Sequence, residues 1–299
     1  MGGWTTADIP DLNGKRVIVT GANSGIGYHA ALRFAAAGAE VVLACRNPGR
    51  GEAALQRIKD ASPGAAVSLA ALDLSSLQSV RDFAAAQVKE PLDLLINNAG
   101  VMAIPRAETA DGFEMQLGTN HLGHFALTGL LLPALLERSG ARVVTVGSTA
   151  SFWGKIRLDD LMSEKKYGKM AAYGQAKLAN LLFSAELGRR EPRLVSVVAH
   201  PGYARTELMA SAVAQTGSRI EAINYAIGGF LFAQSDAAGA LPTVRAALDP
   251  AARSGEIYGP RFMMRGAPVK GFLSPRGRDQ AMAAKLWDRS AELTGVRFG

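Results

Sequence analysis

Short apolar runs alternate with segments of helical length along the first two thirds of this chain. Runs such as RVIVT and EVVLAC are apolar at nearly every position, which is typical of strands covered on both faces. This alternation predicts an α/β fold with a Rossmann-type doubly wound parallel sheet and helices on both faces. The expected strands are 16–20, 40–45, 66–72, 92–97, 142–147 and 194–199, and the expected helices are 25–37, 49–61, 77–87, 120–137, 172–190 and about 236–248.

The 299 residues contain no internal repeat, low-complexity tract or linker that separates two domains, so we expect a single domain over residues 1–299. The regular alternation stops after Pro201, at the carboxyl end of an expected strand. Open α/β sheets bind ligands beyond the carboxyl ends of their strands, so residues about 202–235 are expected to form a substrate loop. The residues about 250–299 are interpreted as a C-terminal extension.

The net charge of +7 is concentrated near the C-terminus, where nine Lys/Arg and four Asp/Glu lie between Arg253 and Arg297. These basic residues do not line one helical face, and no aromatic stacking platform accompanies them. We therefore expect a small-molecule substrate and no nucleic-acid partner.

The sequence also predicts a cytoplasmic protein with no membrane span. Its single cysteine, Cys45, excludes an internal disulfide and so gives no sign of an oxidising compartment. Residues 1–13 lack the basic start and the apolar core of a signal peptide. The longest apolar stretches, 125–136 and 222–233, are near a dozen residues long, whereas a bilayer span needs about 20.

A glycine-rich turn, TGANSGIG at residues 20–27, lies between the first expected strand and the first expected helix. Backbone amides in such a turn, together with the helix N-terminus, bind a pyrophosphate, and glycines permit its close approach. The spacing is G-x-x-x-G-x-G. The alternative interpretation is an ordinary tight turn, which the flanking strand and helix make less attractive.

Tyr173 and Lys177 lie four residues apart, so both face the same side of an expected helix. A free phenol has a pKa near 10, and a nearby ammonium group favours the phenolate. Lys177, together with an oxidised nicotinamide, would lower the pKa of Tyr173 enough for acid/base work near neutral pH. The alternative is a surface pair without a function.

Together these motifs resemble the short-chain dehydrogenase/reductase family over nearly the whole chain. By resemblance the catalytic residues are Asn120, Ser148, Tyr173 and Lys177. By the same resemblance Tyr173 and Lys177 also contact the nicotinamide cofactor. The remaining expected cofactor-binding residues are Gly21, Asn23, Ser24, Gly25, Ile26, Gly27, Arg46, Asn47, Asp73, Leu74, Asn98, Ala99, Gly100, Pro201, Gly202 and Thr206.

The resemblance implies a role for each catalytic residue. Tyr173 would exchange a proton with the substrate oxygen, and Ser148 would donate a hydrogen bond to that oxygen. Lys177 would hold the nicotinamide ribose and depress the tyrosine pKa. Asn120 would anchor a water that links Lys177 to solvent.

Three strings place the resemblance within the family. LACR at 43–46, GTNHLGHF at 118–125 and KLANLLF at 177–183 look like the retinol-dehydrogenase-like branch, and most like its soluble bacterial members. We expect the chain to differ from membrane-bound retinol dehydrogenases in having no N-terminal apolar anchor. His121 and His124 lie within the second string and are interpreted as packing or hydrogen-bonding residues, so no metal is expected.

The expected cofactor is NADP(H). NAD-binding folds place an acidic residue at the end of the second strand, whereas this chain has Cys45 followed by Arg46. Arg46 offers charge-assisted hydrogen bonds to a 2′-phosphate, and Asn47 offers a neutral one. The alternative for Arg46 is an ordinary solvated side chain at a strand end.

The expected substrate is a mainly apolar alcohol, aldehyde or ketone. This follows from the apolar residues after Pro201, although a packed core is the alternative for several of them. They are Tyr203, Leu208, Met209, Ile223, Tyr225, Phe230 and Phe232.

Two other functions fit the sequence less well. A non-catalytic NADP(H)-binding regulatory protein is disfavoured because all four catalytic positions are filled, and an NAD-retaining epimerase or dehydratase because the G-x-x-G-x-x-G spacing is absent. The apolar run 125–136 also suggests association through helices 120–137 and 172–190, as a homodimer or homotetramer.

Overall fold

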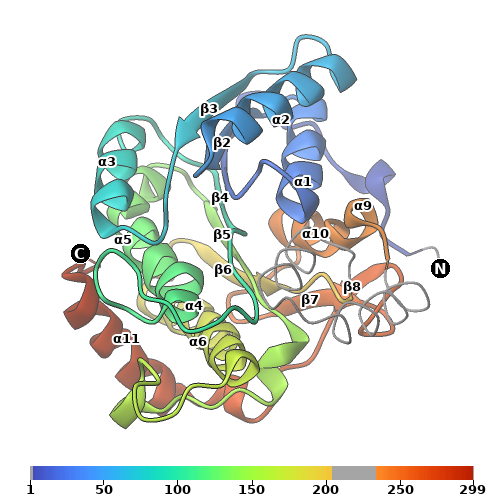
Figure 1. Cartoon of the computed structure of the whole chain (residues 1–299). Coiled ribbons are helices and arrows are strands. Elements are labelled where there is room, and N and C mark those ends of the chain that lie inside the picture. The colour runs from blue at the N-terminus through green and yellow to red at the C-terminus, as the bar shows by residue number, and fades with distance from the viewer. Residues whose placement is uncertain (1–2, 204–233, 299) are drawn as a thin grey trace, which may run out of the picture.

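The computed structural model describes residues 3–203 and 234–298, and it is built around one eight-stranded sheet (Figure 1). The strand order is β3-β2-β1-β4-β5-β6-β7-β8, with β8 alone antiparallel to its neighbour. The strands are β1 (Arg16–Thr20), β2 (Glu40–Cys45), β3 (Val67–Ala71), β4 (Leu94–Asn97), β5 (Arg142–Val146), β6 (Val195–Ala199), β7 (Ile257–Pro260) and β8 (Pro268–Lys270).

The predicted α/β fold with a parallel sheet is therefore confirmed. The strand order reverses between β1 and β4, which pair with each other although two strands separate them in sequence. Loops that leave the sheet on opposite sides of this switch point leave a crevice at the carboxyl ends of the strands. The sequence did not reveal β7 and β8, because they are four and three residues long and include Gly259, Pro260 and Pro268.

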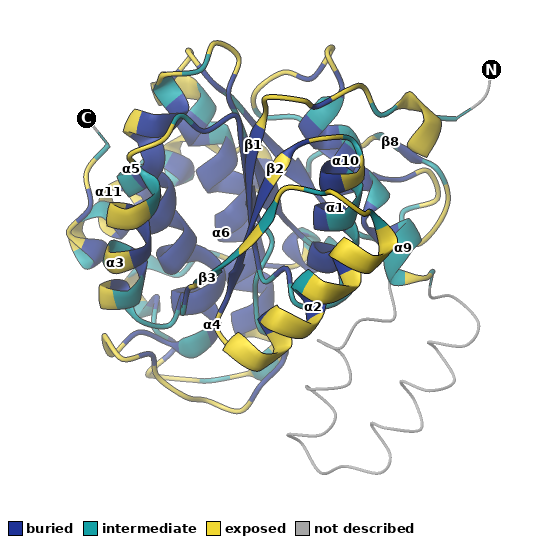
Figure 2. Cartoon of the chain, turned by 90° about the horizontal axis from the view of Figure 1, so that it is seen from above, coloured by how far each residue is buried: buried dark blue, intermediate teal, exposed yellow. Residues whose placement is uncertain are grey.

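Helices cover both faces of the sheet (Figure 2). On one face lie α1 (Gly25–Ala36), α2 (Pro48–Ala61), α9 (Asp236–Gly239) and α10 (Leu241–Leu248), and on the other lie α3 (Leu77–Gln87), α5 (Gly123–Leu136) and α6 (Lys169–Arg190). The last helix, α11 (Gln280–Thr294), packs against α6 from outside. Within the described parts of the chain, no helix combines the length and apolarity needed to cross a membrane.

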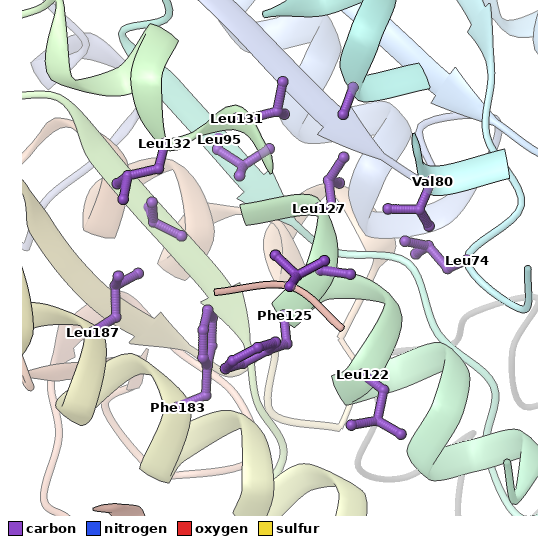
Figure 3. Close-up of a cluster of buried hydrophobic side chains, with 14 of the residues drawn as sticks. Leu74, Val80, Leu95, Leu122, Phe125, Leu127, Leu131, Leu132, Phe183 and Leu187 are labelled. Carbon is purple, nitrogen blue, oxygen red and sulfur yellow. The ribbon is translucent and has the colours of Figure 1, made fainter. Parts of the chain in front are cut away.

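The core consists of two layers because successive strand residues point to opposite faces. On β1, Val17 and Val19 pack with the α1 side, whereas Ile18 packs with the α5 side. The α5 layer is centred on Phe125 and Phe183, whose ring centroids lie 5.7 Å apart (Figure 3).

Two expected helices differ from the structure. The segment expected at 120–137 comprises a π-helical turn over Gly118–Leu122 and then α5, preceded by the short α4 (Met115–Leu117). The segment expected at 236–248 is divided between α9 and α10, next to Pro242, which has no backbone N–H to continue the ladder.

The helix α11 was not predicted, and it packs on the face that α5 and α6 form. Its Trp287 packs edge-on against Phe125 and stacks on Phe183, and Phe298 contacts all three rings. The chain itself therefore covers the apolar face whose exposure suggested association through α5 and α6. The assumption that this face is uncovered was wrong, because the amphipathic helix Gln280–Thr294 packs there, and association as a homodimer or homotetramer stays a prediction.

Candidate active site

The glycine-rich turn after β1 is shaped for close contact with a ligand. Gly21 and Gly25 have φ of +65° and +55°, a region that side chains disfavour. A Cβ at Gly21 would lie 2.9 Å from Ala99, and one at Gly27 would collide with the Asn98 amide and the Gly21 carbonyl. A larger residue at Gly21 or Gly27 would therefore force the backbone out of this turn conformation.

The N-terminus of α1 faces the same turn. Ser24 occupies the N-cap position but makes no capping hydrogen bond through its side chain. First-turn amides without an intrahelical partner attract an anion, and the helix dipole adds to this attraction. The turn and helix therefore fit the pyrophosphate of a dinucleotide.

A cavity of about 440 Å³ extends from this turn across the carboxyl ends of the strands. Seventeen of the expected site residues line it, whereas Asn47 and Asn120 lie outside its wall and Thr206 lies outside the described residues. The seventeen are Gly21, Asn23, Ser24, Gly25, Ile26, Gly27, Arg46, Asp73, Leu74, Asn98, Ala99, Gly100, Ser148, Tyr173, Lys177, Pro201 and Gly202.

Ser148, Tyr173 and Lys177 meet at the far end of this cavity. Ser148 lies two residues beyond the end of β5, and its side chain is close enough to the Tyr173 hydroxyl to lower the pKa of that phenol. Lys177 lies one turn further along α6, with its Nζ 5.9 Å from the Tyr173 ring centroid. The same Nζ donates a hydrogen bond of 2.9 Å to the Val146 carbonyl at the end of β5.

Burial governs the protonation of both groups. It raises the pKa of Tyr173 to about 12, an effect that the Ser148 hydrogen bond partly opposes, and it lowers the pKa of Lys177 to about 8. The predicted lowering of the Tyr173 pKa requires both Lys177 and an oxidised nicotinamide, and it stays a prediction. Desolvation of the phenolate is the largest cause of the upward shift in the pKa, and the Lys177 ammonium group is directed at the Val146 carbonyl.

Asn120 supports the site from the π-helical turn. Its Oδ1 accepts a hydrogen bond of 2.7 Å from the Val101 N–H, and its Nδ2 donates one of 2.9 Å to the Val101 carbonyl. A Cβ at Gly100 would lie 2.7 Å from Asn120 Oδ1 and 3.8 Å from Lys177 Nζ. Asn120 thus holds the loop that passes beside Lys177.

The other end of the cavity carries a positive rim. Arg46 and Arg50 both line it, just beyond the end of β2. The Asn47 side chain caps α2 by accepting a hydrogen bond of 2.9 Å from the Arg50 N–H. Across the cavity, Asp73 Oδ1 accepts hydrogen bonds from the backbone and the hydroxyl of Ser75, which orders that loop.

Several wall residues near Tyr173 were not singled out from the sequence. They are mainly apolar and lie on loops or at a helix start, where no periodic pattern marks them: Val101, Met102, Ala150, Trp153 and Met170. Tyr203, which was expected near the substrate, also lines the cavity. The other expected substrate-loop residues, from Leu208 to Phe232, lie outside the described residues.

Solved structures share this fold. An uncharacterised protein of Mycobacterium paratuberculosis is 42% identical, with a TM-score of 0.83 over all of both chains. A Beutenbergia cavernae protein assigned as an NAD(P)-dependent gluconate 5-dehydrogenase, with bound NADP, is 27% identical with a TM-score of 0.65, over 83% of this chain and 96% of that one.

Sequence comparisons assign the family. Human retinol dehydrogenase 13 is 42% identical over 292 residues, which cover 95% of this chain and 86% of that protein. Human retinol dehydrogenase 12 is 40% identical over 293 residues, covering 96% and 88%. The short chain dehydrogenase family profile matches residues 15–217. The chain therefore belongs to the short-chain dehydrogenase/reductase family of oxidoreductases and is of the retinol-dehydrogenase-like type.

Proposed function

We propose that residues 1–299 form a single dinucleotide-binding oxidoreductase domain that transfers hydride between NADP(H) and a mainly apolar alcohol, aldehyde or ketone. One observation carries this proposal: a single cavity joins the glycine-rich turn to Ser148, Tyr173 and Lys177. When bound, the nicotinamide supplies the hydride, and the protein supplies position and proton transfer.

In this proposal Tyr173 is the acid/base and Ser148 holds the substrate oxygen. Both side chains line the same end of the cavity, where one carbonyl oxygen can contact the two hydroxyl groups. Lys177 lies beside Gly100, where it can bind the ribose hydroxyls of the cofactor.

The protonation state of Tyr173 favours carbonyl reduction at neutral pH. With a pKa of about 12 the phenol keeps its proton, and reduction requires Tyr173 to donate one. Oxidation requires the phenolate, so its rate should rise with pH where that of reduction does not. Initial rates in both directions between pH 6 and pH 9 test this point, and an oxidation rate independent of pH would contradict it.

The preference for NADP(H) rests on the positive rim. Arg46 stands where an NAD-binding fold has an acidic residue that would repel a 2′-phosphate, and Arg50 lines the cavity beside it. The related protein of B. cavernae carries NADP in its solved structure, which supports this cofactor.

An apolar substrate is supported by the wall near Tyr173. Val101, Met102, Trp153 and Met170 surround the substrate end with apolar atoms. The two human relatives are named retinol dehydrogenases, which supports an alcohol or its carbonyl product as the substrate class.

The proposed function is tested by assaying the purified protein with NADPH and NADH against apolar aldehydes, ketones and quinones, with small sugars and hydroxy acids as the comparison set. We expect turnover of apolar carbonyls with NADPH. Exclusive turnover of small hydrophilic substrates would contradict the substrate class. Tight NADPH binding without any turnover would favour the non-catalytic regulatory protein.

A further inference from the structure

His124, in the first turn of α5, is fully buried and makes two hydrogen bonds that join separate parts of the site. Its Nε2 lies 2.9 Å from the hydroxyl of Thr20 at the end of β1. Its Nδ1 lies 3.0 Å from the Asn120 carbonyl in the π-helical turn. Thr20 lines the cavity, but neither histidine nitrogen is needed for the proton transfer proposed above.

The directions of these bonds follow from their chemistry. A carbonyl only accepts, so His124 Nδ1 carries the hydrogen and Nε2 is left as an acceptor for the Thr20 hydroxyl. Burial lowers the pKa of His124 to about 4, so the ring is neutral near pH 7 and keeps this single arrangement. The Thr20 hydroxyl has one hydrogen, and it favours His124 Nε2 at 2.9 Å over the Ile96 carbonyl, which lies 3.3 Å away.

The same Thr20 oxygen accepts two backbone hydrogen bonds from the loop after β4. The N–H groups of Asn98 and Ala99 both lie 2.9 Å from it. Two residues further on, Val101 is held at both its N–H and its carbonyl by the Asn120 side chain. The loop is thus held at one end by Thr20 and at the other by Asn120.

His124 connects these two holders, so the contacts form a closed ring that runs from Thr20 through the loop to Asn120 and back through His124. Gly100 lies within the ring, and its α-carbon faces Lys177, whose Nζ would lie 3.8 Å from a Cβ at that glycine. We infer that His124 is a positioning residue, which fixes the loop at 98–101 against Lys177 and so aligns the nicotinamide end of the cofactor site. This inference rests on the proposed function.

His121 provides a matched control. It lies one turn earlier, is as deeply buried as His124, and is also neutral, because burial lowers its pKa to about 3. Its Nε2 lies 2.8 Å from the Ser290 hydroxyl in α11, the helix that packs against the outside of α6. If the protein needed these histidines only as buried side chains that stabilise the fold, replacing either one would have the same effect on kcat.

The experiment compares His124→Leu with His121→Leu, because leucine is close to histidine in volume and makes neither hydrogen bond. We expect His124→Leu to lower kcat about 10- to 100-fold with the KM for NADPH changed less than about threefold, since small misplacements of reacting groups are costly. His121→Leu should keep kcat within about twofold. His124→Asn and His124→Gln each restore one of the two bonds and should recover part of kcat, and they serve if the leucine variant does not fold.

A second readout needs no turnover. Amide hydrogen exchange of the protein alone should accelerate about three- to tenfold in the segment 97–102 of His124→Leu, because its holders are no longer connected. The same segment in His121→Leu should exchange at the wild-type rate.

Wild-type kcat in His124→Leu, or equal losses in the two leucine variants, would overturn the inference. Unchanged exchange at 97–102 would overturn it as well. If the wild-type protein turns over none of the carbonyls with either cofactor, the proposed function fails instead, and the exchange measurement still decides whether His124 holds the loop.

Discussion

The cavity and the aromatic cluster outside α6 show how this fold separates chemistry from stability. At the cavity end of α6, Tyr173 and Lys177 are buried. Burial raises the pKa of Tyr173 and lowers that of Lys177, so it favours the neutral form of each side chain. Beyond them on the same helix, Phe183 packs with Trp287 and Phe298, whose ring centroids lie 4.4 Å apart. Burying the polar groups of Tyr173 and Lys177 lowers the stability of the fold. The packing of the aromatic rings at the other end of α6 raises it.

If this division is correct, Tyr173→Phe gives the largest effect on activity. We expect kcat to fall about 10²- to 10⁴-fold, because the acid/base group is lost, while the affinity for NADPH and the melting temperature stay nearly unchanged. Steady-state kinetics, fluorescence titration with NADPH and thermal unfolding measure the three quantities. A phenylalanine variant with near-native kcat would end the assignment of Tyr173.

Trp287→Ala should show the opposite pattern. Trp287 is 5% exposed and lies among three aromatic rings, so its truncation is expected to cost about 3 to 5 kcal/mol in the free energy of unfolding. The variant that remains folded should keep kcat/KM within about twofold. Urea unfolding provides the measurement. A loss below about 1 kcal/mol would show that the cluster does not support the fold.

Arg46→Ala sharpens the comparison inside the cavity itself, because it changes the cofactor end without touching Tyr173. Charge-assisted hydrogen bonds contribute about 1.5 to 3 kcal/mol, so NADPH affinity should fall about 10- to 150-fold and NADH affinity should change little. Dissociation constants for both cofactors decide the matter. Equal losses for the two cofactors would contradict a contact with the 2′-phosphate.

The smallest expected effect is on the pH dependence of stability, and it comes from His121, which lies beside the aromatic rings of Phe125 and Phe183. His121 has a pKa of about 3 when folded against 6.5 when unfolded, so below pH 6.5 the unfolded chain takes up a proton that the folded protein does not. Stability should therefore fall as pH drops from 6.5 to 5.5, by at most about 1.4 kcal/mol per pH unit for this group. His121→Leu should show a shallower decline in urea unfolding, and an identical decline would refute the neutral buried state.

Sequence reasoning identified residues that line the cavity where the signal is local. The turn at Gly21–Gly27 and the pair Tyr173–Lys177 are set by spacing along one segment, and the structure places both on one cavity. It failed where contacts join distant segments. Thr20 and His124 are 104 residues apart, and nothing in either segment alone indicates that they meet.

The helix α11 was missed for a different reason. Its buried residues Ala283, Leu286, Trp287 and Ser290 follow helical spacing, Asp279 caps its start and Gly295 ends it with a φ of +66°. These signals are present in the sequence. The Gly, Pro and Arg residues at 271–278, directly before the helix, made the whole C-terminal segment look irregular. The π-helical turn has no comparable signal in the sequence, because its Asn120 pairs with Val101 in a loop 19 residues away.

The most direct measurement follows the hydride itself. The protein is incubated with NADPH deuterated at C4 of the nicotinamide and with an apolar aldehyde or ketone, and the product alcohol is examined by mass spectrometry and NMR. We expect one deuterium on the carbinol carbon for each NADP⁺ formed, with transfer from only one face of the nicotinamide and with the signal lost in Tyr173→Phe. An alcohol without deuterium, or no alcohol from any apolar carbonyl with NADPH, would contradict the proposed oxidoreductase.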